Sequence, residues 1–123
     1  MDGRISEAEL QVMEALWRAS EPLTATDVTD RIDAGRGWSL ATVKTMLSRL
    51  AAKGALTHRE DGRRFFYSPA IDRDSYVGSE SRRFVDRLFG GRLSPLVARL
   101  AEEDVLDDED IAAIEAILRE LKS

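Results

Sequence analysis

The side chains best suited to chemistry in this 123-residue chain are cationic, and they gather in its middle third. Between Arg36 and Tyr67 the sequence holds seven Lys or Arg residues against two Asp or Glu, a net charge of +5, although the whole chain carries −5. No carboxylate occurs from residue 36 to residue 59. Because ionic screening acts over about 8 Å, the local charge decides what this stretch attracts, and phosphate is the anion that it suits.

Hydroxyl groups accompany these cations at helical spacing. After Ser39, apolar residues recur as on a helix with one buried face: Leu40, Val43, Leu47 and Leu50. The opposite face is small, hydroxylic and cationic, and consists of Ala41, Thr42, Lys44, Thr45, Ser48, Arg49 and Ala52. Small residues allow a helix to approach a surface closely, while Thr, Lys and Arg reach phosphates or base edges. We therefore interpret this face as a DNA-reading surface.

The elements that must position this face are predicted from capping signals. A capping box that starts at Ser6 opens a helix over about residues 7–19. Thr24 opens a second helix that is expected to run to about Asp33. The third helix carries the cationic face, and Gly54 stands where a left-handed C-terminal cap is expected.

A β-hairpin is predicted after the third helix. Residues 56–60 and 63–68 flank Asp61-Gly62, and Asp-Gly between two strand-like runs is a strong signal for a two-residue turn. Three arginines gather around the tip: Arg59, Arg63 and Arg64. Three helices followed by a hairpin is the order of a winged helix-turn-helix, in which one helix enters the major groove and the hairpin lies along the DNA backbone.

The C-terminal third returns to helical periodicity. Helices are expected over residues 74–89, after an N-cap at Ser94, and after an N-cap at Asp107 or Asp108. The last helix carries a branched apolar stripe, and since the winged-helix core is already closed, we expect a self-interface. A two-fold dimer matches a two-fold operator and joins two weak contacts into a tight one. The expected dimerisation residues are Tyr76, Phe84, Leu88, Phe89, Leu96, Ile111, Ile114, Ile117, Leu118 and Leu121.

The sequence thus predicts a mainly α fold with a small β-hairpin. Residues 1–70 are expected to form a winged helix-turn-helix DNA-binding domain, and residues 71–123 a helical dimerisation region. An alternative is a winged-helix protein-interaction module that does not read DNA, because a fold does not fix a function. Another alternative is a ligand-responsive regulator with a site at the dimer interface.

Composition excludes several other classes of protein. Without Cys there is no disulfide, thiolate zinc site or cysteine nucleophile, and the single His58 supports neither a catalytic triad nor a His-rich metal site. His58 is expected to be a half-buried strand residue, with a phosphate contact as the alternative. The acidic residues 102–110 are read as a solvated loop and helix N-terminus rather than a metal site. We expect no cofactor, no metal and no enzymatic activity.

The sequence shows no pattern typical of membrane insertion or secretion. No apolar run approaches the roughly 20 residues that a membrane span requires. The N-terminal residues lack the basic-then-apolar form of a secretory signal. We therefore expect a cytoplasmic protein without membrane insertion.

The chain resembles the penicillinase-repressor family of transcriptional regulators, the BlaI/MecI/CopY type. The resemblance rests on Trp-Ser-x-x-Thr-Val-x-Thr-x-Leu-x-Arg-Leu-x-x-Lys-Gly-x-Leu at 38–56, with Gly62-Arg63, Tyr67-x-Pro69 and the segment from Ile5 to Trp17. It implies a homodimeric winged-helix repressor that binds a pseudo-palindromic double-stranded DNA operator. By position, it places recognition contacts at Thr42, Lys44, Thr45 and Arg49 and wing contacts at Arg63 and Arg64. Trp38 and Tyr67 would support these contacts by packing.

The resemblance also implies a hypothesis about release from DNA. Family members that respond to β-lactams are inactivated by a membrane sensor-protease that cleaves in the dimerisation region, which would connect this chain to antibiotic resistance. The corresponding bond here is Arg99-Leu100, where those repressors have Asn-Phe, so this chain departs from their cleavage motif. Copper-responsive members carry a C-terminal cysteine cluster, and this chain has no Cys.

Overall fold

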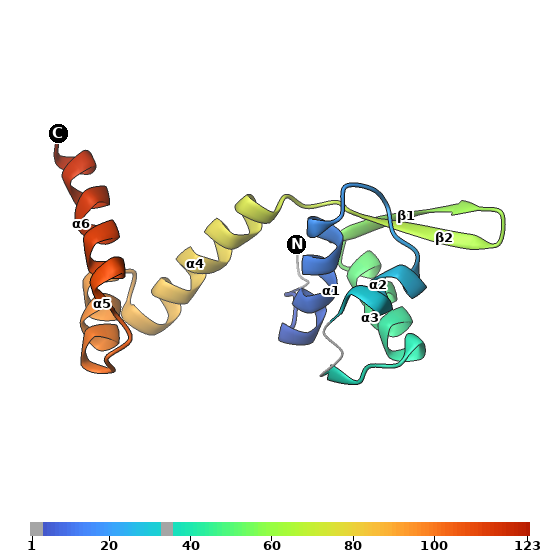
Figure 1. The fold of residues 1–123 in the computed structure, drawn as a ribbon, viewed down its shortest axis with the longest axis horizontal. Coiled ribbons are helices and arrows are strands. Elements are labelled where there is room, and N and C mark those ends of the chain that lie inside the picture. Colours follow the sequence, from blue (N-terminus) through green and yellow to red (C-terminus); the bar gives the residue numbers. More distant parts are fainter. Residues whose placement is uncertain (1–3, 33–35) are drawn as a thin grey trace. The chain divides into compact units, whose positions relative to one another are not determined.

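The computed structural model describes residues 4–32 and 36–123, and its described part contains six α-helices and one hairpin (Figure 1). The elements are α1 (Glu7–Arg18), α2 (Ala25–Arg31), α3 (Leu40–Ala52), β1 (Leu56–Asp61), β2 (Arg64–Pro69), α4 (Arg73–Phe89), α5 (Leu93–Glu102) and α6 (Asp108–Lys122). The chain divides into two compact units, one up to Tyr76 and one from Val77 onward. The helix α2 ends at Arg31, and the end predicted at Asp33 lies outside the described residues.

Side-chain caps start the helices of the first unit, as predicted. The Ser6 hydroxyl accepts from the Glu9 amide at 3.1 Å, and the Glu9 carboxylate accepts from the Ser6 amide at 2.8 Å. Thr24 forms the same reciprocal box at the start of α2. Gly54, after α3, has a φ of 80°, which is the left-handed conformation expected of a C-terminal cap.

The core of the first unit is built from α1, α2, α3 and the start of β1. Its largest fully buried side chains are Met13, Leu23, Leu47, Leu50, Val12, Val28 and Val43. The apolar stripe predicted for α3 is right at three of its four positions and wrong at Leu40, which is 39% exposed. Leu40 is the first residue of α3 and lies at the end of the packed face, while Met46 is buried within it.

The hairpin pairs β1 and β2 in antiparallel register with Asp61 opposite Arg64. The loop is therefore Gly62-Arg63, one residue later than the predicted Asp61-Gly62. Gly62 has a φ of 67°, which fits the first central position of a type II′ turn, where Gly is favoured. The hairpin projects beyond the three helices in Figure 1.

A short bridge extends this sheet at the other edge of β2. The Leu23 amide donates to the Tyr67 carbonyl at 3.0 Å, and the Tyr67 amide donates to the Leu23 carbonyl at 2.8 Å. The segment just before α2 is therefore fastened to the hairpin by the backbone, which fixes the base of the hairpin against the helices.

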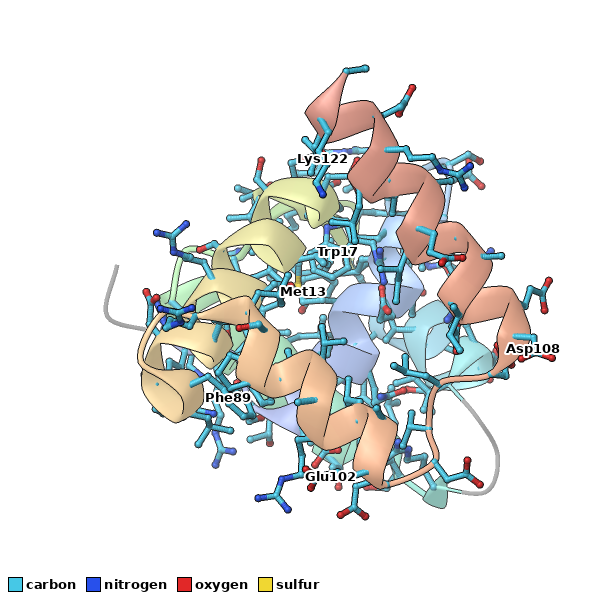
Figure 2. The ribbon with its side chains drawn as sticks, turned by 90° about the vertical axis from the view of Figure 1, so that its left-hand side faces the viewer. Met13, Trp17, Phe89, Glu102, Asp108 and Lys122 are labelled. Atoms are coloured by element: carbon cyan, nitrogen blue, oxygen red, sulfur yellow. The ribbon has the colours of Figure 1, made fainter. Side chains whose placement is uncertain are left out.

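The second unit consists of most of α4 with α5 and α6, whose ends are marked in Figure 2 by Phe89, Glu102, Asp108 and Lys122. The N-cap predicted at Ser94 is wrong, because α5 begins at Leu93 after Arg92, without a side-chain cap. Pro95 still lies in the first turn, where a backbone N–H has no helical partner to lose. The N-cap at Asp107 is confirmed, since its carboxylate accepts from the Asp110 amide at 2.8 Å.

Candidate nucleic-acid interface

The outer face of α3 presents the residues predicted to read DNA. Thr42, Lys44, Thr45 and Arg49 are all exposed, whereas Val43, Met46, Leu47 and Leu50 are buried on the opposite face. From Thr42 to Arg49 the helix rises about 10 Å, which is close to the roughly 12 Å width of the major groove. Thr42, Thr45 and Arg49, at i, i+3 and i+7, form one stripe of about this length, whereas Lys44 lies toward the other edge of the exposed face.

The two threonine hydroxyls on this face are already oriented by the helix. Thr45 Oγ1 donates its proton to the Ala41 carbonyl at 3.1 Å, so towards a ligand it offers only lone pairs and its methyl group. Thr42 Oγ1 lies 3.1 Å from Ser39 Oγ, the cap of α3. Fixed rotamers of this kind reduce the entropy lost when a contact forms.

A surface pocket of about 230 Å³ lies beside α3, and three of the predicted contacts, Lys44, Arg63 and Arg64, line it. Its lining comes from the start of α2, the middle of α3 and the hairpin: Thr24, Ala25, Thr26, Lys44, Arg63, Arg64, Phe65 and Tyr67. We call this the α2–wing pocket. Three cations that converge with threonine hydroxyls suit a phosphate oxygen, because charge-assisted hydrogen bonds are the strong ones. Sequence reasoning missed Thr26, since only the fold brings the start of α2 beside the hairpin.

The cations of this surface differ in whether they have ionic partners. Within the described ranges, Arg36, Lys44, Arg49, Arg63 and Arg64 form no ion pair. Arg59 lies 3.8 Å from Asp61 and over the Phe66 ring, which reduces its availability. Unpaired cations are the ones that can exchange counterions for DNA phosphates.

Lys53 belongs to the basic stretch of the sequence but is used inside the fold. Its Nζ binds Glu9 Oε1, on a carboxylate that is only 3% exposed, and donates to the Arg4 carbonyl at 2.7 Å. Burial acts to raise the pKa of Glu9, but hydrogen bonds from Lys53 and the Ser6 amide together hold it below its ordinary value. Lys53 therefore joins the end of α3 to α1 instead of adding to the outer cationic surface.

His58 is exposed on β1, and the prediction that it is half-buried is wrong. Its ring lies 5.3 Å from Phe65 and 6.0 Å from Tyr67, both on the neighbouring strand. In the antiparallel register His58 is opposite Tyr67, so these side chains share one face of the hairpin.

Two aromatic side chains near this surface are partly buried. Trp38 and Tyr67 are half-buried and pack against the core of the first unit. The guanidinium of Arg36 lies 5.6 Å from the centre of the Trp38 ring, within the range of a cation–π contact. Sequence reasoning did not pair these two residues, although the Arg-x-Trp spacing places them two positions apart.

The ten residues predicted to mediate dimerisation occupy two different settings. Nine of them lie in the second unit, where α5 and α6 bury no residue and Leu121 is 77% exposed. Tyr76 lies in the first unit, with its ring centre 5.8 Å from that of Trp17. The packing of Tyr76 within its own chain accounts for its partial burial.

The described residues offer neither a metal site nor a membrane-spanning helix. They contain no group of three or more His, Cys, Asp or Glu residues placed to hold a metal ion. No helix in this part of the chain combines the length and the apolar character needed to cross a membrane.

Comparison with known proteins decides the family. The family model described as "Penicillinase repressor" matches residues 5–120. The chain belongs to the penicillinase repressor family. The penicillinase repressor of Bacillus licheniformis is 38% identical over 120 residues, which cover 98% of this chain and 93% of that protein. The methicillin resistance regulatory protein MecI of Mammaliicoccus sciuri is 27% identical over 114 residues, covering 93% and 92%.

A solved structure of this family supports the fold of the first unit. It is the solution structure of the monomeric form of Bacillus licheniformis BlaI in complex with the blaP half-operator, with a TM-score of 0.51 and 41% identity. The match covers 62% of this chain and 92% of that chain. The penicillinase repressor family is one of transcriptional repressors with a winged-helix domain, so the predicted fold class, family and non-enzymatic nature are supported.

Proposed function

We propose that this chain represses transcription by binding double-stranded operator DNA with α3 in the major groove and the hairpin along the backbone. The observation that carries the proposal is that four exposed cations of α3 and the hairpin form no ion pair among the described residues (Lys44, Arg49, Arg63 and Arg64), and that three of them, all but Arg49, line one pocket. A relative with 41% identity, Bacillus licheniformis BlaI, was solved in complex with the blaP half-operator. Repulsion is small on α3, because no carboxylate occurs between Leu40 and Arg59.

Each side of this surface has a distinct chemical task. On α3, Thr42, Thr45 and Arg49 face the base edges, where Arg suits guanine O6 and N7 and a threonine methyl suits the thymine methyl. In the α2–wing pocket and at the hairpin tip, Lys44, Arg63 and Arg64 bind backbone phosphates, with Arg63 and Arg64 each neutralising one, which supplies affinity and register but little sequence information. Base readout and phosphate binding are therefore assigned to different side chains, and α3 contributes to both.

The test of DNA binding starts from selection of random duplexes by the purified chain, followed by fluorescence anisotropy with the selected sequence. We expect a preference of about 1,000-fold or more over scrambled DNA. Arg49→Gln should reduce that preference, whereas Arg18→Gln, at an exposed position on α1, serves as the control. Equal affinity for selected and scrambled DNA would contradict sequence-specific repression and favour a winged-helix interaction module.

We also propose that the second unit forms a homodimer with a second copy of this chain. Of the eleven large hydrophobic side chains that are exposed among the described residues, nine lie from Val77 onward. Apolar surface of this extent is unfavourable in water and is typical of an interface. Sedimentation equilibrium should give twice the 13.7 kDa mass of one chain, and a mass of one chain at micromolar concentration would contradict the proposal.

For release, we propose cleavage of the Arg99-Leu100 bond by a membrane sensor-protease. The bond lies near the end of α5, where Arg99 is exposed and Leu100 is half-buried, so α5 must open before an extended substrate can form. Immunoblotting of cells treated with a β-lactam should detect a fragment whose new N-terminus is Leu100. An intact chain in cells that have been fully induced would contradict cleavage and leave a ligand at the dimer interface as the alternative.

A further inference from the structure

The first turn of α4 is fastened to α1 by contacts that the proposed DNA surface does not use. Arg73, the first residue of α4, donates from Nε to Glu14 Oε1 at 2.8 Å and from Nη2 to Glu14 Oε2 at 3.2 Å. A bidentate pair of this kind fixes orientation as well as distance. The hydrogen bond from Arg73 is the main reason that the pKa of Glu14 lies below its ordinary value.

Trp17, which is labelled in Figure 2 and lies one turn further along α1, makes a second set of contacts with the same segment. Its Nε1 donates to the Ile71 carbonyl at 3.0 Å, and its ring lies 5.8 Å from that of Tyr76 at an interplanar angle of 39°. Ile71 and Tyr76 also pack against the core of the first unit. The chain is thus held immediately before α4 begins and again at the fourth residue of α4.

This fastening is confined to the first turn of a long helix. Asp72 caps α4 by accepting from the Ser75 amide at 3.1 Å, and Tyr76 is the last described residue that packs against the core. The next residue, Val77, is 40% exposed, yet α4 continues without a break to Phe89. Only the beginning of α4 is therefore positioned by the winged-helix unit.

The direction in which α4 leaves this turn has a large effect at its other end. Seventeen residues of α-helix span roughly 25 Å. A tilt of about 10° at the base displaces the far end by about 4 Å, which exceeds the 3.4 Å rise of one DNA step along a strand. A small change at the first turn is thus enough to alter which base-pair spacing fits.

We define the α1–α4 junction as four residues: Glu14, Trp17, Arg73 and Tyr76. We propose that the α1–α4 junction is a positioning element that selects the spacing between operator half-sites. The proposal rests on the proposed function, because spacing matters only to a dimer that engages two half-sites. None of the four residues lies on α3 or the hairpin, so one winged-helix unit reads its half-site without using them.

The test measures the affinity of the full-length chain for one half-site and for duplexes with two half-sites, by fluorescence anisotropy. The half-site is the consensus that the wild-type chain selects from random DNA, and the spacer of the longer duplexes is varied one base pair at a time. Arg73→Gln and Glu14→Gln remove the bidentate pair, while Trp17→Phe removes only the indole N–H donor. The matched control is Arg82→Gln, whose arginine is on α4, is 80% exposed and pairs with Asp86 of the same helix.

We expect every variant to bind one half-site within about twofold of the wild type, because the reading surface is intact. On two half-sites, Arg73→Gln and Glu14→Gln should weaken binding at the best spacing by about tenfold and flatten the spacing profile, because effective concentration depends on geometry. The double variant Glu14→Arg/Arg73→Glu, which swaps the two charges, should restore the spacing profile. The control Arg82→Gln should leave the profile unchanged.

Three results would overturn the proposal. The first is a wild-type spacing profile in both single variants. The second is an equal loss on one and on two half-sites, because the junction would then act only through the stability of the first unit. The third is a wild-type chain that selects no DNA sequence, which would overturn the proposed function and this inference with it.

Discussion

Replacing Arg63 and Arg64 together by Gln should flatten the salt dependence of DNA binding without changing the preferred sequence. Both arginines line the α2–wing pocket with Lys44, and neither forms an ion pair within the described ranges. Neither guanidinium is therefore held in an ion pair, although the carboxylate of Asp27 acts on Arg64 from a longer distance, and each can neutralise a phosphate. Glutamine keeps a polar side chain of moderate length but removes the charge.

The magnitude follows from counterion release. Each neutralised phosphate contributes about 0.9 to the magnitude of the slope of log K against log salt. The double variant should therefore lower that magnitude by about 1.8 when one winged-helix unit binds one half-site. Between about 50 and 200 mM salt, a slope of 1.8 corresponds to roughly a 12-fold change in affinity. The variant should therefore bind much more weakly than the wild type at low salt, and the difference should shrink about 12-fold at high salt.

The assay is anisotropy of a labelled half-site duplex across this salt range, with Arg18→Gln as the control for loss of a surface arginine outside the pocket. Binding to a panel of single-base variants of the half-site measures whether the preferred sequence changes. A slope equal to that of the wild type would refute phosphate binding in the α2–wing pocket. A changed base preference would assign the two arginines to base readout instead.

Three further predictions concern stability and assembly. Glu9→Gln should reduce the acid sensitivity of folding. Burial acts to raise the pKa of Glu9, but hydrogen bonds from Lys53 and Ser6 hold it below its ordinary value, so the stability that the Glu9 carboxylate contributes is lost as pH falls through that lowered pKa. Thermal unfolding of both proteins between about pH 7 and pH 3 measures this, and parallel curves would contradict it. Leu50→Ala should cost about 2–5 kcal/mol in chemical denaturation because Leu50 is fully buried, whereas Leu40→Ala should cost far less. Ile117→Glu, at a position 58% exposed in one chain, should halve the mass measured by light scattering, and a persistent dimer would place the interface elsewhere.

Local signals in the sequence were sufficient where one short segment determines the geometry. The capping pairs at Ser6 and Thr24 and the left-handed Gly54 depend only on neighbouring residues, and all three were predicted. The predicted position of the hairpin turn was one residue too early. Gly62 is compatible with the second central position of a type I′ turn and with the first central position of a type II′ turn, so the sequence alone did not decide between them. Ser94 looked like a cap because it precedes Pro95, but a proline fits anywhere in the first turn.

Contacts between distant segments could not be predicted from single-segment patterns. Lys53 looked like one more cation of the basic stretch, and its pairing with the buried Glu9 depends on how α1 packs against the end of α3. Thr26 lines the α2–wing pocket because the Leu23–Tyr67 bridge brings the hairpin to α2. The outer face of α3 was predictable because periodicity alone separates it from the buried face.

The hydrogen bond from Trp17 to the Ile71 carbonyl has a consequence for the order of synthesis. Its two residues are 54 positions apart, and the Glu14–Arg73 pair spans 59. During translation the outer side of α1 therefore stays uncovered until the ribosome has released most of the first unit. A nascent chain that stalls after Pro69 holds both hairpin strands but leaves the indole N–H of Trp17 without this acceptor. The outer side of α1 is thus completed only when the first turn of α4 emerges.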